Sequence, residues 1–128
     1  MADVVLLDAG VLFEFLADQT NASAVEVILA AVQGVVASVT VYELFRGVVS
    51  HSHLPQRNQL LSLVHTIDLT EQIATLAGQI YTDLQGSGNV IDNEDILLAA
   101  TSLHHSIPIF TTNVKHFARI RRLHLYQT

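Results

Sequence analysis

The chain has 128 residues, half of them hydrophobic, with a formal net charge of −6 and no cysteine. This length fits one domain, residues 1–128, with a substantial core, and the lack of cysteine excludes disulfides and thiolate metal sites. The acidic balance argues against a protein that coats nucleic acid, which normally needs a basic face. The sequence shows no signal peptide and no apolar stretch near the roughly 20 residues that span a bilayer, so we expect a cytoplasmic location.

The first half of the chain alternates apolar strands with amphipathic helices. The pattern predicts strands at 3–7 and 35–39, and helices at 10–16, from Thr20 or Asn21 to about 33, and from about Thr40 to Val49. Gly34 lies where the residue that caps the end of a helix belongs.

The second half continues this alternation. Pro55 fits the first turn of a helix that runs to about Val64. The remaining predicted elements are a strand at 66–69, a helix capped by Thr70 through Leu84, a loop at 85–89, a helix at 93–105, a strand at 107–111, a helix at 114–120 and an edge strand at 123–126. This order predicts an α/β fold with a mostly parallel central sheet of about five strands, flanked by helices.

Three carboxylates, far apart in sequence, are expected at strand-to-helix turns. Asp8 follows the first apolar strand, Glu43 lies early in the helix after the second strand, and Asp95 opens an apolar helical run. Such turns gather at the carboxyl edge of a parallel sheet, where these folds place their sites. Clustered carboxylates repel one another unless a cation neutralises them, and oxygen ligands suit Mg²⁺.

Each acid also has a structural interpretation. Asp8 fits the N-cap of the following helix, Glu43 completes a Thr-x-x-Glu capping box with Thr40, and Asp95 complements the dipole of its helix. These interpretations stay open for each acid singly; the joint pattern favours a shared site.

Asp92 and Glu94 are neighbours that compete with Asp95 for the same role. Asp95 is the better candidate because Leu98 and Ala99 share its helical face, so its side chain points inward. Asp92 is expected to cap the helix or to support the ligands from behind, and Glu94 is expected to point outward.

Four stretches in series carry a family resemblance. They are Leu7–Leu12, Ser38–Leu44 with Gly47, Asp95–Thr101 and Ile109–Phe117. Over nearly the whole chain they resemble, in the right order, the PIN domain, and in particular the small VapC-type toxins of bacterial and archaeal toxin–antitoxin pairs. No single motif is very specific, but four in series are.

The resemblance implies a Mg²⁺- or Mn²⁺-dependent endoribonuclease, the toxin of such a pair, that hydrolyses RNA phosphodiester bonds. It implies that Asp8, Glu43 and Asp95 are the catalytic, metal-binding acids. Thr111 and Asn113 match a Thr-x-Asn motif, with Asn113 a contributor at the fourth position of the site. A homodimer and a small antitoxin, whose C-terminal segment lies over the active site, are also implied.

The chain departs from this family in two places. Many members follow the first acid with residues that carry a hydroxyl or an amide, where this chain has Ala9 and Gly10. Many also carry a fourth acid near the Thr-x-Asn motif, where this chain has Asn113 and His116. These departures leave the number of metals open and favour the alternative, a PIN-like module that has lost catalysis and serves in binding or assembly.

Basic residues concentrate near the end of the chain. Four of the six lie within the last fourteen positions: Lys115, Arg119, Arg121 and Arg122. We treat them as candidate phosphate contacts, and Thr111 and His116 as further candidate substrate contacts; a solvated surface strip is the other interpretation. The seven histidines otherwise show no pattern of metal ligands.

A signalling receiver or a phosphoaspartate phosphatase is a rival from another class. Either would use Asp8 as a nucleophile after the first strand. Such phosphatases usually carry a second Asp two residues on, where this chain has Gly10. Receivers pair acids near the start of the chain, and Asp3 is too far back along the strand to pair with Asp8.

Overall fold

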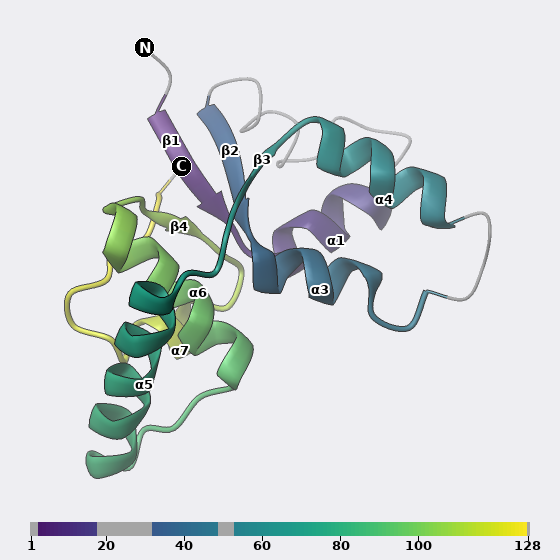
Figure 1. Ribbon diagram of the computed structural model, residues 1–128. Coiled ribbons are helices and arrows are strands. Elements are labelled where there is room, and N and C mark those ends of the chain that lie inside the picture. The colour runs from purple at the N-terminus through teal and green to yellow at the C-terminus, as the bar shows by residue number, and fades with distance from the viewer. Residues whose placement is uncertain (1–2, 18–31, 49–52, 128) are drawn as a thin grey trace.

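In the part of the chain that the structure describes, four parallel strands form the central sheet (Figure 1). The computed structural model describes residues 3–17, 32–48 and 53–127. The strands lie in the order β3-β2-β1-β4, and they are β1 (Asp3–Leu7), β2 (Val32–Ala37), β3 (His65–Ile67) and β4 (Ile109–Phe110). The predicted α/β fold is confirmed, with four strands where about five were expected. The edge strand predicted at 123–126 is reduced to one bridge between Leu125 and Ile109.

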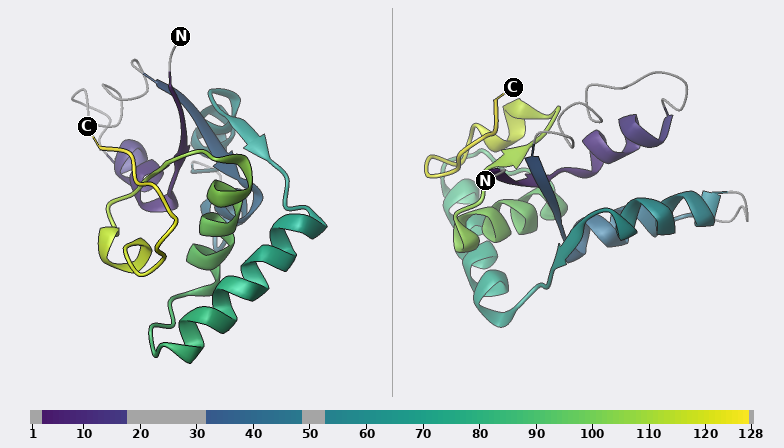
Figure 2. Two further views of the ribbon diagram at one scale, coloured as in Figure 1. Left: turned by 90° about the vertical axis from the view of Figure 1, so that its left-hand side faces the viewer. Right: turned by 90° about the horizontal axis from the view of Figure 1, so that it is seen from above.

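Helices cover both faces of this sheet (Figures 1 and 2). One face carries α1 (Ala9–Ala17), α3 (Ser38–Phe45) and α4 (His53–Ser62), and the other carries α5 (Glu71–Gly86), α6 (Asn93–His105) and α7 (Val114–Phe117). None of the described helices is long and apolar enough to cross a membrane.

Alternation along β1 creates the two cores. Val5 and Leu7 pack into the core under α1, α3 and α4, whereas Leu6 packs into the core under α5 and α6. Successive side chains of a strand point to opposite faces, so a short apolar run with no polar member, such as Val4–Leu7, has to be covered on both sides.

The order of the strands determines where a site forms. From β1 the chain adds β2 and then β3 on one side, and it later adds β4 on the other side of β1. Neighbouring connections therefore diverge at the carboxyl ends of β1 and β4, the place where open α/β sheets leave a crevice. Asp8 directly follows β1, and Thr111 directly follows β4.

Several boundaries near β2 differ from the sequence prediction, and the strand expected at 35–39 covers Val32–Ala37. Most of the helix expected from about 21 to 33 lies outside the described residues, but its end is wrong, since Val32 pairs with Asp3 and begins β2. Gly34 is paired inside this strand and caps no helix. The helix predicted from Thr40 to Val49 begins at Ser38 and ends at Phe45.

Boundaries later in the chain also differ from the sequence prediction, because each helix or strand ends where its own hydrogen bonding ends. Helix α5 continues to Gly86, which shortens the predicted loop at 85–89. The strand predicted at 107–111 is paired only over Ile109–Phe110, and the helix predicted at 114–120 ends at Phe117. The predicted cap of α5 is confirmed: the Ile73 N–H donates to the Thr70 hydroxyl.

Candidate active site

An acidic pocket opens at the carboxyl edge of the sheet. It has a volume of about 460 Å³ and is lined by side chains from four places in the sequence. These are the start of α1, helix α3, the start of α6 and the loop after β4. Its polar lining residues are Asp8, Glu43, Asp92, Asp95, Thr112 and Asn113. The three acids predicted to converge therefore line one pocket, together with Asn113.

Asp8 is held in one orientation by both of its carboxylate oxygens. Its Oδ1 accepts a hydrogen bond from the Ala9 N–H at 2.8 Å, and its Oδ2 accepts one from the Thr111 hydroxyl at 2.6 Å. Thr111 in turn accepts from the Asn113 N–H at 2.9 Å. Because Leu7 pairs with Phe110 across the sheet, the next residues of the two strands, Asp8 and Thr111, lie side by side. The Thr-x-Asn motif thus orients Asp8.

Glu43 extends into the pocket from α3, and the pKa of its carboxyl group is raised. Burial raises its pKa from 4.5 to about 7, and the negative charges of Asp8, Glu94 and Asp95 add to this effect while Arg46 opposes it. The capping-box interpretation of Glu43 is wrong, because Ala37 is the N-cap of α3, no side-chain cap is formed, and Thr40 lies inside the helix.

Asp95 reaches the pocket from the first turn of α6. The prediction that it follows a strand is wrong, since α6 follows α5 and a short loop. Leu98 and Ala99 are buried as expected from their shared face. Burial raises the pKa of Asp95, and a hydrogen bond from His116 acts in the opposite direction. The Nδ1 atom of His116 lies 2.9 Å from Asp95 Oδ2.

The donor set of this pocket fits a divalent cation. Ligand atoms of Asp92, Asp95 and His116 lie within 4.8 Å of one another, and Asp8 and Glu43 line the same pocket. Burial, with the repulsion of neighbouring acids, raises the pKa of both Glu43 and Asp95 in the protein without a cation. A cation that prefers hard oxygen ligands would remove that repulsion.

Two polar residues of the pocket were underrated or missed by sequence reasoning. Asp92 precedes α6 and makes no side-chain cap there; its side chain lines the pocket instead. Thr112 was not a candidate at all. A Cβ atom on Gly10 would lie 3.1 Å from the Thr112 hydroxyl oxygen, so Gly10 leaves room for a hydroxyl group that arrives from the loop after β4. No pattern along the chain could show that pairing, because it depends on β1 and β4 being neighbours.

Glu94 lies beside the pocket but does not line it. Its Oε1 accepts from Arg46 Nη1 at 3.3 Å, and its side chain is 33% exposed. This agrees with the expectation that Glu94 turns away from Asp95, and the ion pair links α3 to α6 at the rim of the site.

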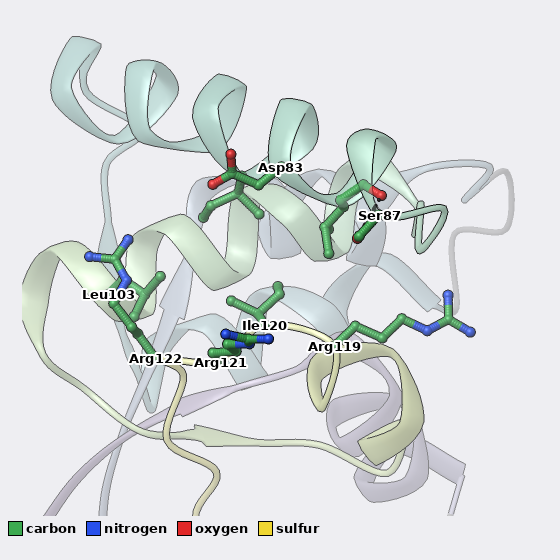
Figure 3. A pocket seen from close by; sticks show the side chains of 9 residues that line it. Asp83, Ser87, Leu103, Arg119, Ile120, Arg121 and Arg122 are labelled. Atoms are coloured by element: carbon green, nitrogen blue, oxygen red, sulfur yellow. Dashed lines mark hydrogen bonds between the residues drawn. The ribbon is translucent and has the colours of Figure 1, made fainter.

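Three of the predicted phosphate contacts line a different pocket, drawn in Figure 3. Arg119, Arg121 and Arg122 surround a cavity of about 400 Å³ on the α5 and α6 side. It shares no residue with the acidic pocket. Arg119 Nη1 donates to the carbonyl oxygen of Val90 at 3.2 Å, two residues before Asp92 in the chain. Lys115 is exposed on α7. The basic residues therefore lie near the acidic pocket rather than in it.

Comparison with known proteins shows the fold and the family of this chain. A family model described as PIN domain matches residues 5–123. Ribonuclease VapC1 of Methanocaldococcus jannaschii is 30% identical over 87 residues, which is 68% of this chain and 64% of that protein. Ribonuclease VapC2 of Rickettsia felis is 32% identical over 93 residues, or 69% of each chain. The aligned part thus spans about two thirds of these relatives.

Solved structures share the fold at lower identity. A structure of VapBC-1 from nontypeable Haemophilus influenzae superposes with a TM-score of 0.81, at 24% identity and over 97% of both chains. Others with this fold are described as a toxin–antitoxin complex or as a member of the VapBC family of toxin–antitoxin systems. The chain belongs to the PIN domain family, with VapC-type ribonucleases as its relatives.

Proposed function

We propose that this chain is a metal-dependent endoribonuclease and the toxin of a toxin–antitoxin pair. The observation that carries the proposal is the convergence of Asp8, Glu43, Asp92 and Asp95 on one pocket at the carboxyl edge of the sheet. Two further points support it: the relatives are named ribonucleases, and toxin–antitoxin complexes share the fold. A module that had lost catalysis would have no reason to keep four carboxylates together at a cost in repulsion.

The residues of the pocket divide the chemistry among them. Asp8, Asp92 and Asp95 would hold Mg²⁺ or Mn²⁺, with Glu43 completing the set. The bound cation would supply Lewis acidity toward the scissile phosphate. Glu43, whose pKa burial and neighbouring acids raise to about 7 in the pocket without a cation, would orient the attacking water or accept its proton. The Thr112 hydroxyl and the Asn113 amide are placed to hydrogen-bond phosphate oxygens.

The cavity lined by Arg119, Arg121 and Arg122, which we call the arginine pocket, would give the RNA strand a path beyond the acidic pocket. Scissile phosphate and carboxylates repel one another, so affinity for the polyanion has to come from elsewhere on the surface. Arg119, Arg121 and Arg122 line the same pocket, and Arg119 is hydrogen-bonded to Val90, two residues before Asp92 in the chain. His116 and Lys115 on α7 are further candidates for contact with the strand.

Exposed aromatic side chains in and near the acidic pocket support a protein partner. Phe13 lines the acidic pocket with 39% of its surface exposed, and Tyr42 on α3 is 56% exposed. These aromatic side chains suit contact with an antitoxin segment that lies over the site. A homodimer and a cytoplasmic location complete the proposal.

The test is cleavage of a mixed RNA substrate by the purified protein without antitoxin, in Mg²⁺ and in EDTA. Asp95→Asn should reduce the rate by about 100-fold or more, since groups that merely orient metal ligands are already worth about 10–100-fold. Its fold should be unchanged, because burial already favours the neutral form of Asp95. Asp68→Asn, an exposed residue outside the pocket, is the matched control and should cleave like the wild type. Cleavage in EDTA, or at the wild-type rate by Asp95→Asn, would refute the assignment.

A further inference from the structure

His116 makes two short contacts through one ring nitrogen. Its Nδ1 lies 2.9 Å from Asp95 Oδ2 and 2.8 Å from the side-chain nitrogen of Asn113. The His116 side chain is 33% exposed and that of Asp95 is 14% exposed. All three residues belong to the acidic pocket or touch a residue that does. A neutral imidazole nitrogen is either a donor or an acceptor, so Nδ1 cannot hydrogen-bond both an ionised Asp95 and the NH₂ group of Asn113.

The carboxylate decides which of the two roles Nδ1 has. If Nδ1 carried a lone pair, that lone pair would face the Asp95 oxygen at 2.9 Å, which is repulsive for an ionised carboxylate. If Nδ1 carries a proton, it donates to Asp95 in a charge-assisted hydrogen bond. The amide of Asn113 then turns its oxygen toward the same N–H. The nitrogen and oxygen of an amide are assigned from such networks and not observed directly.

We propose that His116 is a positioning residue that holds the Asp95 carboxylate through Nδ1–H, so that the other carboxylate oxygen is free for the cation. This inference rests on the proposed metal-dependent function and names a residue on which the cation site depends. With its N–H committed to Asp95, Nδ1 serves the site as a donor and not as a ligand. The Asn113 amide, turned in this way, presents its NH₂ group away from His116.

Two substitutions test whether the hydrogen bond from Nδ1, rather than the size or polarity of the His116 side chain, supports the cation site. In His116→Asn the amide nitrogen takes the position of Nδ1, whereas in His116→Gln it takes the position of Nε2, out of reach of Asp95. Mn²⁺ binding to the full chain is measured by calorimetry. His116→Asn should retain the wild-type affinity within about threefold, and His116→Gln should lose about 10–100-fold, the range for groups that orient metal ligands. Equal affinities of the two variants would overturn the proposal.

Two spectroscopic readouts do not depend on catalysis. In the metal-free protein at mildly alkaline pH, the ¹⁵N shifts of His116 should show a protonated Nδ1 and an unprotonated Nε2; the opposite tautomer would overturn the proposal. In the Mg²⁺-loaded protein, the ¹⁵N shifts of His116 should still show a protonated Nδ1; an Nδ1 that has lost its proton to become a ligand would equally overturn the proposal. If wild type bound no Mn²⁺, the proposed function would fail, and the tautomer would still decide the role of His116.

Discussion

Thr111 is the residue through which the loop after β4 determines the geometry of the site. Its buried hydroxyl donates to Asp8 and accepts from the Asn113 N–H. Thr111→Val keeps the shape but leaves a carboxylate oxygen and a backbone N–H without this partner. The loss of buried partners costs about 1–3 kcal/mol, so we expect a drop of that size in the free energy of unfolding, measured with urea, and weaker Mn²⁺ binding.

Thr111→Ser is the matched control for this prediction. It restores the hydroxyl group and loses one methyl group, so Mn²⁺ affinity should return close to the wild-type value. If Thr111→Val bound Mn²⁺ as tightly as Thr111→Ser, the hydroxyl would have no part in orienting Asp8.

Residue-level reasoning correctly brought three acids to one pocket, and it failed for the capping role of Glu43. Glu43 and Thr40 matched a capping box, yet α3 begins two residues earlier, at Ser38. Thr40 is fully buried, and within the described residues its hydroxyl has no hydrogen-bond partner. Its local capping propensity was overridden by packing, because β2 ends at Ala37 and the helix starts as soon as the strand pairing stops.

Helix α5 begins where the sequence predicted, as do β1, α6 and α7, and α6 also ends at the predicted residue. The Thr70 hydroxyl accepts from the Ile73 N–H at 3.3 Å, and Ile73 is fully buried against the core. Loss of an N-cap costs about 1 kcal/mol, so Thr70→Ala should lower the free energy of unfolding by about that amount in a urea titration.

Thr70→Ser keeps the cap and should lose little stability. Mn²⁺ affinity should be the same in Thr70→Ala, Thr70→Ser and wild type. Neither Thr70 nor any residue of α5 lines the acidic pocket. A large change in Mn²⁺ affinity would mean that α5 positions Asp95 through α6 more directly than their shared core indicates.

At the scale of the whole molecule, the acidic pocket makes stability depend on pH and on cations. The pKa of Glu43 is raised from 4.5 to about 7 by burial and by neighbouring acids, and burial raises that of Asp95 as well. The folded chain therefore binds more protons than the unfolded chain between these values. Stability contributed by the protonated groups is fully present below pH 4.5 and is lost as pH rises through about 7.

We expect the melting temperature in EDTA, taken relative to Glu43→Gln, to fall between pH 4.5 and pH 7.5. Each pKa unit corresponds to about 1.4 kcal/mol, but Glu43 is partly exposed, so solvent screening reduces the effect to the order of 1 kcal/mol. Saturating Mg²⁺ should restore the loss above pH 7, because it binds the ionised carboxylates of the folded state alone. A difference that did not change with pH would show that Glu43 titrates normally.

The sequence by itself determined the α/β class, the parallel sheet, the order of its elements and three acids of the site. It could do so because strand and helix periods, turns and caps are local, and because carboxylates after β1 and β2 have to reach one edge of a parallel sheet. The membership in the PIN domain family was visible in the same four stretches.

Only the tertiary structure decided which side chains meet across that edge. The pairing of β1 with β4 brings Thr111 to Asp8 and Thr112 to Gly10, and the approach of α7 to α6 brings His116 to Asp95. The tertiary structure also places Arg119, Arg121 and Arg122 in a separate pocket. These contacts join residues up to 103 positions apart, and they depend on strand order and helix packing, which no local pattern along the chain encodes.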